Sequence, residues 1–201
     1  MRHISKMSLA ALAAATAFAV GGCGDDESSS SNAAGGDGVD RAFVADMIPH
    51  HESAIEMAKI AQQRGESTFV KQLADDIADS QGDEIATMRR EDEGLEMAGV
   101  KRGSLGVPGH MMGMDDDPAE LKTAEPFDRA FIEMMIPHHE GAIEMAKVEL
   151  AKGKDPELKA LAQGIIDAQQ REIAEMRKQL DNSGTSDGAM PDEEHGGART
   201  G

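Results

Sequence analysis

The segment "DRAFVADMIPHHESAIEMAK" (residues 40–59) recurs almost unchanged as "DRAFIEMMIPHHEGAIEMAK" (residues 128–147), so each residue of the first copy has a counterpart 88 positions later, as His50 has in His138. The same offset relates "VKQLADDIADSQGDEIATMR" (residues 70–89) to "LKALAQGIIDAQQREIAEMR" (residues 158–177). In the second pair of segments, apolar residues recur at steps of three and four, the spacing of one face of an α-helix. The sequence therefore predicts a pair of helices, written twice.

A single helical pair cannot cover its own apolar face, so we expect the two pairs to pack against each other. The predicted fold is all-α, a four-helix bundle built from two duplicated helical hairpins. Cap and turn residues occupy matching places in both repeats. Asp40 and Asp128 are predicted N-caps of the first helices, and Gly65 and Gly153 are predicted to end them in a left-handed conformation. The predicted caps of the second helices are Ser67 and Asp155, the latter followed by Pro156 at the first helical position.

The N-terminal region has the marks of an export signal: a short basic start, an apolar middle and small residues before a cysteine. "VGGC" (residues 20–23) resembles the bacterial lipobox, after which a lipid would be attached to Cys23. An ordinary secretory signal with a chance cysteine is the alternative. Cys23 is the only cysteine, and the Ser/Gly/Asp-rich stretch after it has the composition of a flexible tether. We therefore expect an exported lipoprotein, anchored on the extracytoplasmic face of the cell membrane.

The predicted layout has six parts. They are a lipoprotein signal peptide (1–22), the lipidated cysteine and a flexible tether (23–39), hairpin repeat 1 (40–98), a Met/Gly/Asp-rich linker (99–126), hairpin repeat 2 (127–181) and a disordered tail (182–201).

Charge and composition exclude several functions. Removing residues 1–22, which carry Arg2 and Lys6, leaves 179 of the 201 residues and takes the formal charge from −18 to about −20. Such a surface repels nucleic acid and attracts cations. One cysteine excludes an internal disulfide and a Cys-rich zinc or iron–sulfur site. We recognise no nucleophile–base pair and no phosphate-binding glycine loop, so no enzyme activity is expected.

Polar residues interrupt the apolar faces of the predicted helices. On the first helix, Met47 lies one turn before the pair His50 and His51, and Pro49 between them is expected to bend the helix. On the second helix, Gln81 and Glu84 fall in the apolar stripe. Burying such groups is unfavourable unless they pair with the histidines opposite or share a metal ion with them. The candidate ligands are Met47, His50, His51, Gln81, Glu84 and Met88 in repeat 1, and Met135, His138, His139, Gln169, Glu172 and Met176 in repeat 2.

Imidazole and thioether donors suit copper, with Cu(I) favoured over Cu(II), better than they suit magnesium or calcium. Glu84 and Glu172 keep a third option open, an enzyme that uses a harder or borderline metal such as Zn²⁺ or Mn²⁺. A structural Glu–His pair in each hairpin is the alternative without metal, and the histidines would then be structural or pH-sensing. Spacing decides neither which histidine of each pair faces inward nor whether there is one shared site or two. Met57 and Met145 are interpreted as core residues.

The linker carries a second candidate site. "GHMMGMDDD" (residues 109–117) places His110, Met111, Met112 and Met114 in a polar, Gly-rich setting. These residues could collect Cu(I) or Ag(I), or they could fold down as an apolar lid, since methionine adapts to both uses.

The doubled "MIPHHE", each copy followed by Gln-x-x-Glu-Ile-x-x-Met, resembles the domain-of-unknown-function 305 family over residues 40–177. That family is similar to ferritin-like helical bundles and includes exported copper-binding proteins of the CopM type. The resemblance implies the twelve ligand positions given above and a role in copper buffering, trafficking or resistance, with a copper-delivery partner or self-association left open. The Glu-x-x-His spacing of ferritin-type di-iron centres is missing, so iron chemistry is not expected. The alternative function is an envelope interaction or stress module that binds no metal.

Overall fold

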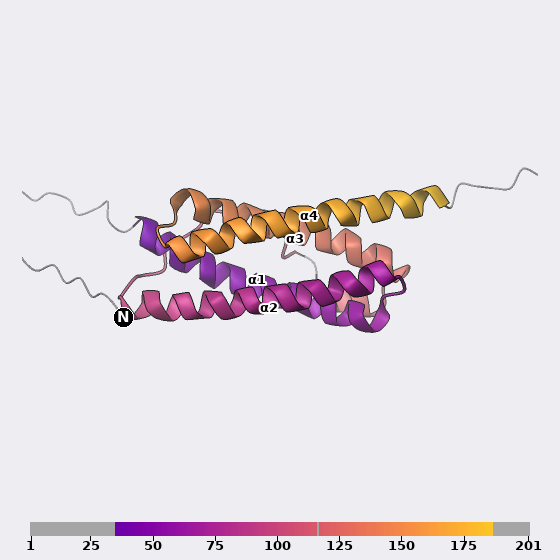
Figure 1. Ribbon diagram of the computed structural model, residues 1–201, viewed down its shortest axis with the longest axis horizontal. Helices are drawn as coiled ribbons and strands as arrows, with labels where there is room; N and C mark the ends of the chain where they lie inside the picture. The colour runs from indigo at the N-terminus through magenta and orange to yellow at the C-terminus, as the bar shows by residue number, and fades with distance from the viewer. Residues whose placement is uncertain (1–34, 116, 187–201) are drawn as a thin grey trace, which may run out of the picture. The chain divides into compact units, whose positions relative to one another are not determined.

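The computed structural model describes residues 35–115 and 117–186, which contain four long helices and no strand (Figure 1). The helices are α1 (Gly35–Arg64), α2 (Thr68–Met97), α3 (Phe127–Lys152) and α4 (Pro156–Ser186). Two short 3₁₀ helices, η1 (Gly109–Met111) and η2 (Pro118–Lys122), lie in the linker. The all-α four-helix prediction is confirmed. Cys23, the predicted signal peptide and residues 187–201 lie outside the described residues.

The bundle consists of two antiparallel hairpins, α1 with α2 and α3 with α4. The hairpins meet mainly through α1 and α3, which run in opposite directions, whereas α2 and α4 touch each other little (Figure 1). Each of α1 and α3 therefore has two partners, its own hairpin mate and the other hairpin. In the described part of the chain, no helix has both the length and the apolar character needed to cross a membrane.

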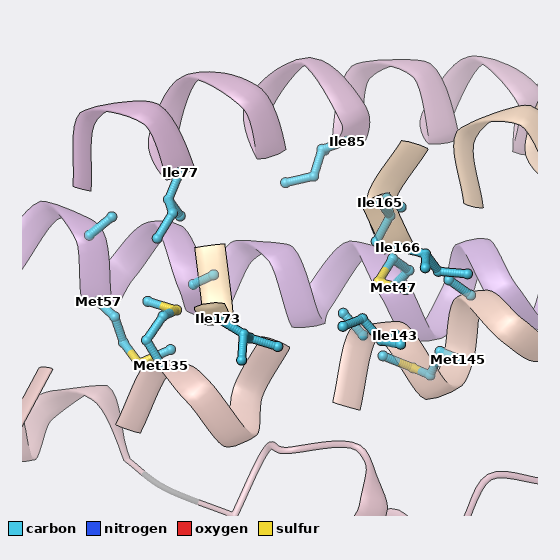
Figure 2. Close-up of a cluster of buried hydrophobic side chains, with 14 of the residues drawn as sticks. Met47, Met57, Ile77, Ile85, Met135, Ile143, Met145, Ile165, Ile166 and Ile173 are labelled. Atoms are coloured by element: carbon cyan, nitrogen blue, oxygen red, sulfur yellow. The ribbon is translucent and has the colours of Figure 1, made fainter. Parts of the chain in front are cut away.

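The core follows the predicted apolar stripe. Val70, Leu73, Ala74, Ile77, Ile85 and Met88 of α2 are all buried. Methionine and isoleucine side chains fill the space between the helices (Figure 2). Full burial of one such side chain stabilises the fold by about 1.5–3 kcal/mol, so a truncation such as Ile77→Ala should destabilise it by about 2–5 kcal/mol.

The prediction that Asp40 caps its own helix was wrong. α1 begins at Gly35, five residues earlier and inside the predicted tether, and Asp40 is a buried residue of its second turn. Its carboxylate instead accepts hydrogen bonds from the backbone N–H groups of Lys154 (2.8 Å) and Asp155 (3.3 Å), in the turn that leads into α4. Asp40 therefore binds the turn before a helix of the other hairpin.

Asp128 repeats this arrangement in reverse. The N-cap of α3 is Pro126, and Asp128 lies in the first turn of the helix. Its carboxylate accepts hydrogen bonds from the N–H groups of Glu66 and Ser67, both at 2.8 Å, in the turn before α2. Glu66 and Ser67 are the repeat counterparts of Lys154 and Asp155. Each hairpin thus supplies a carboxylate that binds the turn of the other hairpin.

The turn glycines also differ from the prediction. Gly153 has φ −62°, and the left-handed glycines of the described residues are Gly99, Gly106 and Gly113, not Gly65 or Gly153. Glycine is needed at position 65 for lack of space, because a Cβ on Gly65 would lie 2.6 Å from the carbonyl oxygen of Ala61. The predicted caps of the second helices are confirmed. Ser67 Oγ accepts from Val70 N (3.2 Å), and Asp155 accepts from Leu158 N (3.0 Å). α4 continues to Ser186, into the predicted tail.

Candidate metal centre

All four motif histidines are buried: His50, His51, His138 and His139 are at most 2 % exposed. Neighbouring side chains on a helix diverge by about 100°, so burying both members of a pair requires two covered faces. α1 and α3 have two such faces, since each packs on its hairpin mate and on the other hairpin. Both histidines of each pair therefore face the interior of the bundle.

The inner pair, His50 and His138, joins the two hairpins. Their ring centroids are 3.8 Å apart and their planes are tilted by 38°. His50 Nε2 lies 2.9 Å from the backbone oxygen of Met112. A carbonyl can only accept, so His50 carries its proton on Nε2 and its Nδ1 holds a free lone pair. Neither ring nitrogen of His138 has a hydrogen-bond partner in the protein.

The outer pair, His51 and His139, contacts glutamates within each hairpin. His51 Nε2 lies 2.8 Å from Glu84 Oε2, and His139 Nε2 lies 2.7 Å from Glu172 Oε2. In each case Nδ1 is buried without a partner. A histidine whose one nitrogen donates to a carboxylate presents the other nitrogen in a fixed direction, which is how metal-binding imidazoles are commonly held. Glu84 and Glu172 thus contact the outer imidazoles, which is one of the two uses that the sequence left open for them.

The two glutamines complete the cluster. Gln81 and Gln169 are 2 % and 3 % exposed, and Oε1 of Gln81 and both polar side-chain atoms of Gln169 lack a hydrogen-bond partner in the protein. Together with the histidines they bring eight buried, unpartnered nitrogen and oxygen atoms into the described residues of the motif. Leaving a buried polar group unpaired costs about 1–3 kcal/mol, and native proteins leave few such groups.

Burial also sets the protonation of the inner pair. It lowers the pKa of His50 to about 3, with the neighbouring imidazole of His51 adding to the effect. Burial and the imidazole of His50 hold the pKa of His138 far below its ordinary value. Both rings are therefore neutral at physiological pH, and the neutral imidazole is the form that binds metal ions.

The candidate methionines Met47, Met88, Met135 and Met176 are fully buried. Met57 and Met145, predicted to be core residues, are equally buried in the same cluster. In Figure 2, Met57 and Met135 lie at one end of the view and Met47 and Met145 at the other. Burial alone therefore does not separate candidate ligands from packing residues. Within the described residues, no group of three or more His, Cys, Asp or Glu side chains is arranged to hold a metal ion.

The four candidate residues of the linker differ in their exposure to solvent. Met112 packs against the core, whereas Met111 and Met114 are 45 % and 43 % exposed and His110 is also exposed. Beside the linker is a pocket of about 650 Å³, lined by His110 and Met111 and by residues of α3 and α4. Met112 thus folds onto the core, as the lid alternative predicts, and the side chains of His110, Met111 and Met114 are exposed to solvent.

Sequence reasoning missed the buried carboxyl group of Glu149. Burial, first, and the neighbouring carboxylate of Asp40 raise the pKa of Glu149 to about 8. The side chain is fully buried on α3. Its counterpart in repeat 1 is Ala61, and this substitution of a carboxyl for a methyl group on an apolar face was the signal available in the sequence.

The chain is similar to a known protein family and to several solved structures. The family model described as "Domain of unknown function (DUF305)" matches residues 40–180, with an overlapping match over residues 6–92. Solved structures of CopM in the Cu(II)-bound and Cu(I)-bound forms are 35 % and 34 % identical, with TM-scores of 0.63 and 0.60, over 71 % of this chain and 96 % of theirs. A DUF305 fragment from Deinococcus radiodurans is 33 % identical over 73 % of this chain and 96 % of its own, with a TM-score of 0.59.

A curated relative, the uncharacterized protein L153 of Acanthamoeba polyphaga mimivirus, is 48 % identical over 54 residues, which are 27 % of this chain and 36 % of that protein. The chain thus spans about a third of that relative's length. The family match instead spans residues 40–180, and the solved structures of CopM cover 71 % of this chain. The chain belongs to the DUF305 family.

Proposed function

We propose that this protein is an exported copper-binding protein that holds the ion in the buried histidine cluster between its two hairpins. The observation that carries the proposal is the set of eight unpartnered polar atoms on six motif residues. A bound cation would pair with the imidazole nitrogens and amide oxygens among them, whereas a core without an ion leaves these acceptors unpaired. The copper-bound forms of the related CopM support copper as the ion.

The donor set favours Cu(I). The free imidazole nitrogens of His50, His51, His138 and His139 would be the main ligands. The remaining candidates are the sulfurs of Met47, Met88, Met135 and Met176 and the amide oxygens of Gln81 and Gln169. Cu(I) takes few ligands and Met47 and Met135 lie at opposite ends of the view in Figure 2, so only those nearest the inner pair would complete the site. Thioether and imidazole donors prefer Cu(I) to harder ions. Glu84 and Glu172 would orient the outer imidazoles.

A single site shared by both repeats follows from the inner pair. The 3.8 Å between the rings of His50 and His138 brings the two motifs together at the hairpin interface. One ion at this interface would explain why both repeats keep the same polar residues, since each supplies half of the cluster.

The setting of the proposed function is extracytoplasmic. The sequence places a lipid-attachment cysteine, Cys23, after an export signal, so the protein would be anchored to the membrane surface. Its strongly negative charge would concentrate cations around it. The protein would buffer copper, pass it to a delivery partner or contribute to resistance, with no catalytic step and no nucleic-acid partner.

A titration of the mature protein with Cu(I) against a competing chelator tests the proposal. We expect the double variant His50→Ala/His138→Ala to bind at least about 100-fold more weakly, the upper range for loss of residues at a metal site. His110→Ala is the matched control for the main site and should retain the high-affinity phase. Equal affinity of the wild type and the double variant would contradict the assignment.

A structural role for the outer histidines has one observation in its favour, their hydrogen bonds to Glu84 and Glu172. The protein would then be an interaction or stress module of the envelope. The low pKa of His50 argues against pH sensing by the inner pair between pH 5 and 8. Thermal unfolding separates the two functions, because only the copper-binding protein should gain stability on addition of Cu(I) at constant pH.

A further inference from the structure

The linker crosses the histidine cluster at very close range. We call residues 109–113 the strap. A Cβ on Gly141 of α3 would lie 2.0 Å from the backbone oxygen of Met112, and a Cβ on Gly113 would lie 2.4 Å from the backbone oxygen of Pro137. Gly113 also has φ +68°, which only glycine adopts readily. Two glycines, one on each side of the contact, let the strap rest directly on α3 beside His138.

The strap occupies a ring nitrogen of the inner pair. His50 donates its Nε2–H to the carbonyl of Met112, the strap residue that also touches Gly141. This hydrogen bond ties the linker to α1, while the glycine contacts hold it on α3. The strap therefore spans the hairpin interface over the His50–His138 pair.

The repeats differ where the strap lies. The counterpart of Gly141 in repeat 1 is Ser53, so the motif "MIPHHE" is followed by Gly in the covered copy and by Ser in the other. A serine at position 141 would carry the Cβ that the Met112 carbonyl excludes. Duplication alone would give both repeats the same residue, and the glycine of repeat 2 fits the close passage of the linker.

A pocket borders the strap. The pocket of about 650 Å³ is lined by His110 and Met111 and by Gly113, Pro137 and Gly141, the residues of the strap contact. His110 and Met111 are exposed, whereas His50 and His138 are buried and do not line the pocket.

We propose that the strap is a gate that controls entry of a soft cation to the His50–His138 pair from this pocket. The nature of the cation rests on the proposed function, but the gating does not. In the closed state the strap shields both imidazoles. In the open state the Met112 carbonyl leaves His50, which frees Nε2 and exposes the inner pair.

The test uses Gly141→Ala in the mature protein, which pushes the strap away and changes no candidate ligand. Gly164→Ala in α4 is the matched control, since a Cβ there meets nothing within 4 Å. The first readout needs no metal. It is the rate at which diethyl pyrocarbonate modifies His50 and His138, measured by mass spectrometry, together with the rate of hydrogen exchange of the strap amides. The second readout is the rate of Cu(I) uptake from a chelator.

We expect Gly141→Ala to speed strap exchange and modification of both histidines by about tenfold, the upper range for loss of one neutral hydrogen bond. Cu(I) uptake should also become faster, and Gly164→Ala should match the wild type. Faster strap exchange with unchanged histidine modification would overturn the gate, and so would unchanged strap exchange. If the helicity of Gly141→Ala falls, Gly113→Ala in the strap replaces it with the same expected results. Absence of Cu(I) binding in every variant would refute the proposed function while the modification rates still decide the gate.

Discussion

His138 shows at the residue scale what distinguishes this core from an ordinary helical bundle. Its ring is buried against His50, and both nitrogens lack a protein partner. Desolvation keeps the ring neutral, because charging it in this setting would be strongly unfavourable. A neutral, buried, unpartnered imidazole contributes little to stability and is well suited to bind a cation. The same reasoning applies to Nδ1 of His51 and His139.

The methionines allow a matched comparison at this scale. Met47→Leu and Met135→Leu should weaken Cu(I) binding by about 10-fold or more, because they remove a proposed sulfur ligand. Met57→Leu and Met145→Leu are the controls, as these residues are equally buried but predicted to be core. All four changes conserve volume and should alter stability by less than about 1.5 kcal/mol. Equal binding by all four variants would show that sulfur from Met47 and Met135 is not used.

Glu149 should make stability depend on pH. Its pKa rises from an ordinary 4.5 to about 8 in the folded protein, so the folded state retains a proton that the unfolded state releases. Stability from this group is therefore full below about pH 4.5 and falls as pH rises to about 8. The loss should be on the order of a few kcal/mol for a fully buried carboxyl.

Urea unfolding of the wild type and Glu149→Gln at pH 5 and pH 8 measures this effect. Gln cannot ionise, so the variant should lose much less stability over that interval. Glu144→Gln is the control, since Glu144 is a largely exposed partner of Lys147. Parallel losses in wild type and Glu149→Gln would show that Glu149 is not the group responsible.

At the element scale, each hairpin depends on the other for its turn. Asp128 of α3 accepts two hydrogen bonds from the turn before α2, and Asp40 of α1 does the same for the turn before α4. These contacts cross the hairpin interface. Packing of α1 on α3 and ordering of the turns before α2 and α4 therefore form together.

Asp128→Ala should lower the free energy of unfolding by about 1–2 kcal/mol, the typical effect of losing an N-cap side chain. Glu133→Ala removes a nearby carboxylate from a half-exposed pair with Arg129 and should change stability by about 0–1 kcal/mol. Chemical denaturation of both variants measures the difference. Equal effects would mean that the cap between hairpins contributes nothing beyond surface charge.

The elements could be predicted where the determining contacts are local. The spacing of Val70, Leu73 and Ile77 gives the buried face of α2, and Ser67 caps the helix it precedes. The destinations of the Asp40 and Asp128 carboxylates could not be predicted, because their partners lie more than 60 residues away. The position of the strap could not be predicted either, because it depends on the backbone oxygen of Met112 and on the space that Gly141 leaves by having no side chain. The burial of both histidines of each pair also required knowing that α1 and α3 have two covered faces.

At the scale of the whole bundle, duplication accounts for the location of the cluster. Two copies of one hairpin meet through α1 and α3 (Figure 1), and at this contact His50 lies against its repeat counterpart His138. Identical residues facing each other across such a contact form one symmetric cluster. The linker breaks the symmetry, because it bonds to His50 and leaves His138 without a partner.

Anomalous scattering at the copper edge, from crystals of the Cu(I)-loaded mature protein, tests the central claim most directly. A single strong peak between α1 and α3, in contact with nitrogen atoms of both His50 and His138, is the result we predict. Two separate peaks, one inside each hairpin, or peaks confined to Met111 and Met114 on the surface, would contradict a shared centre in the core.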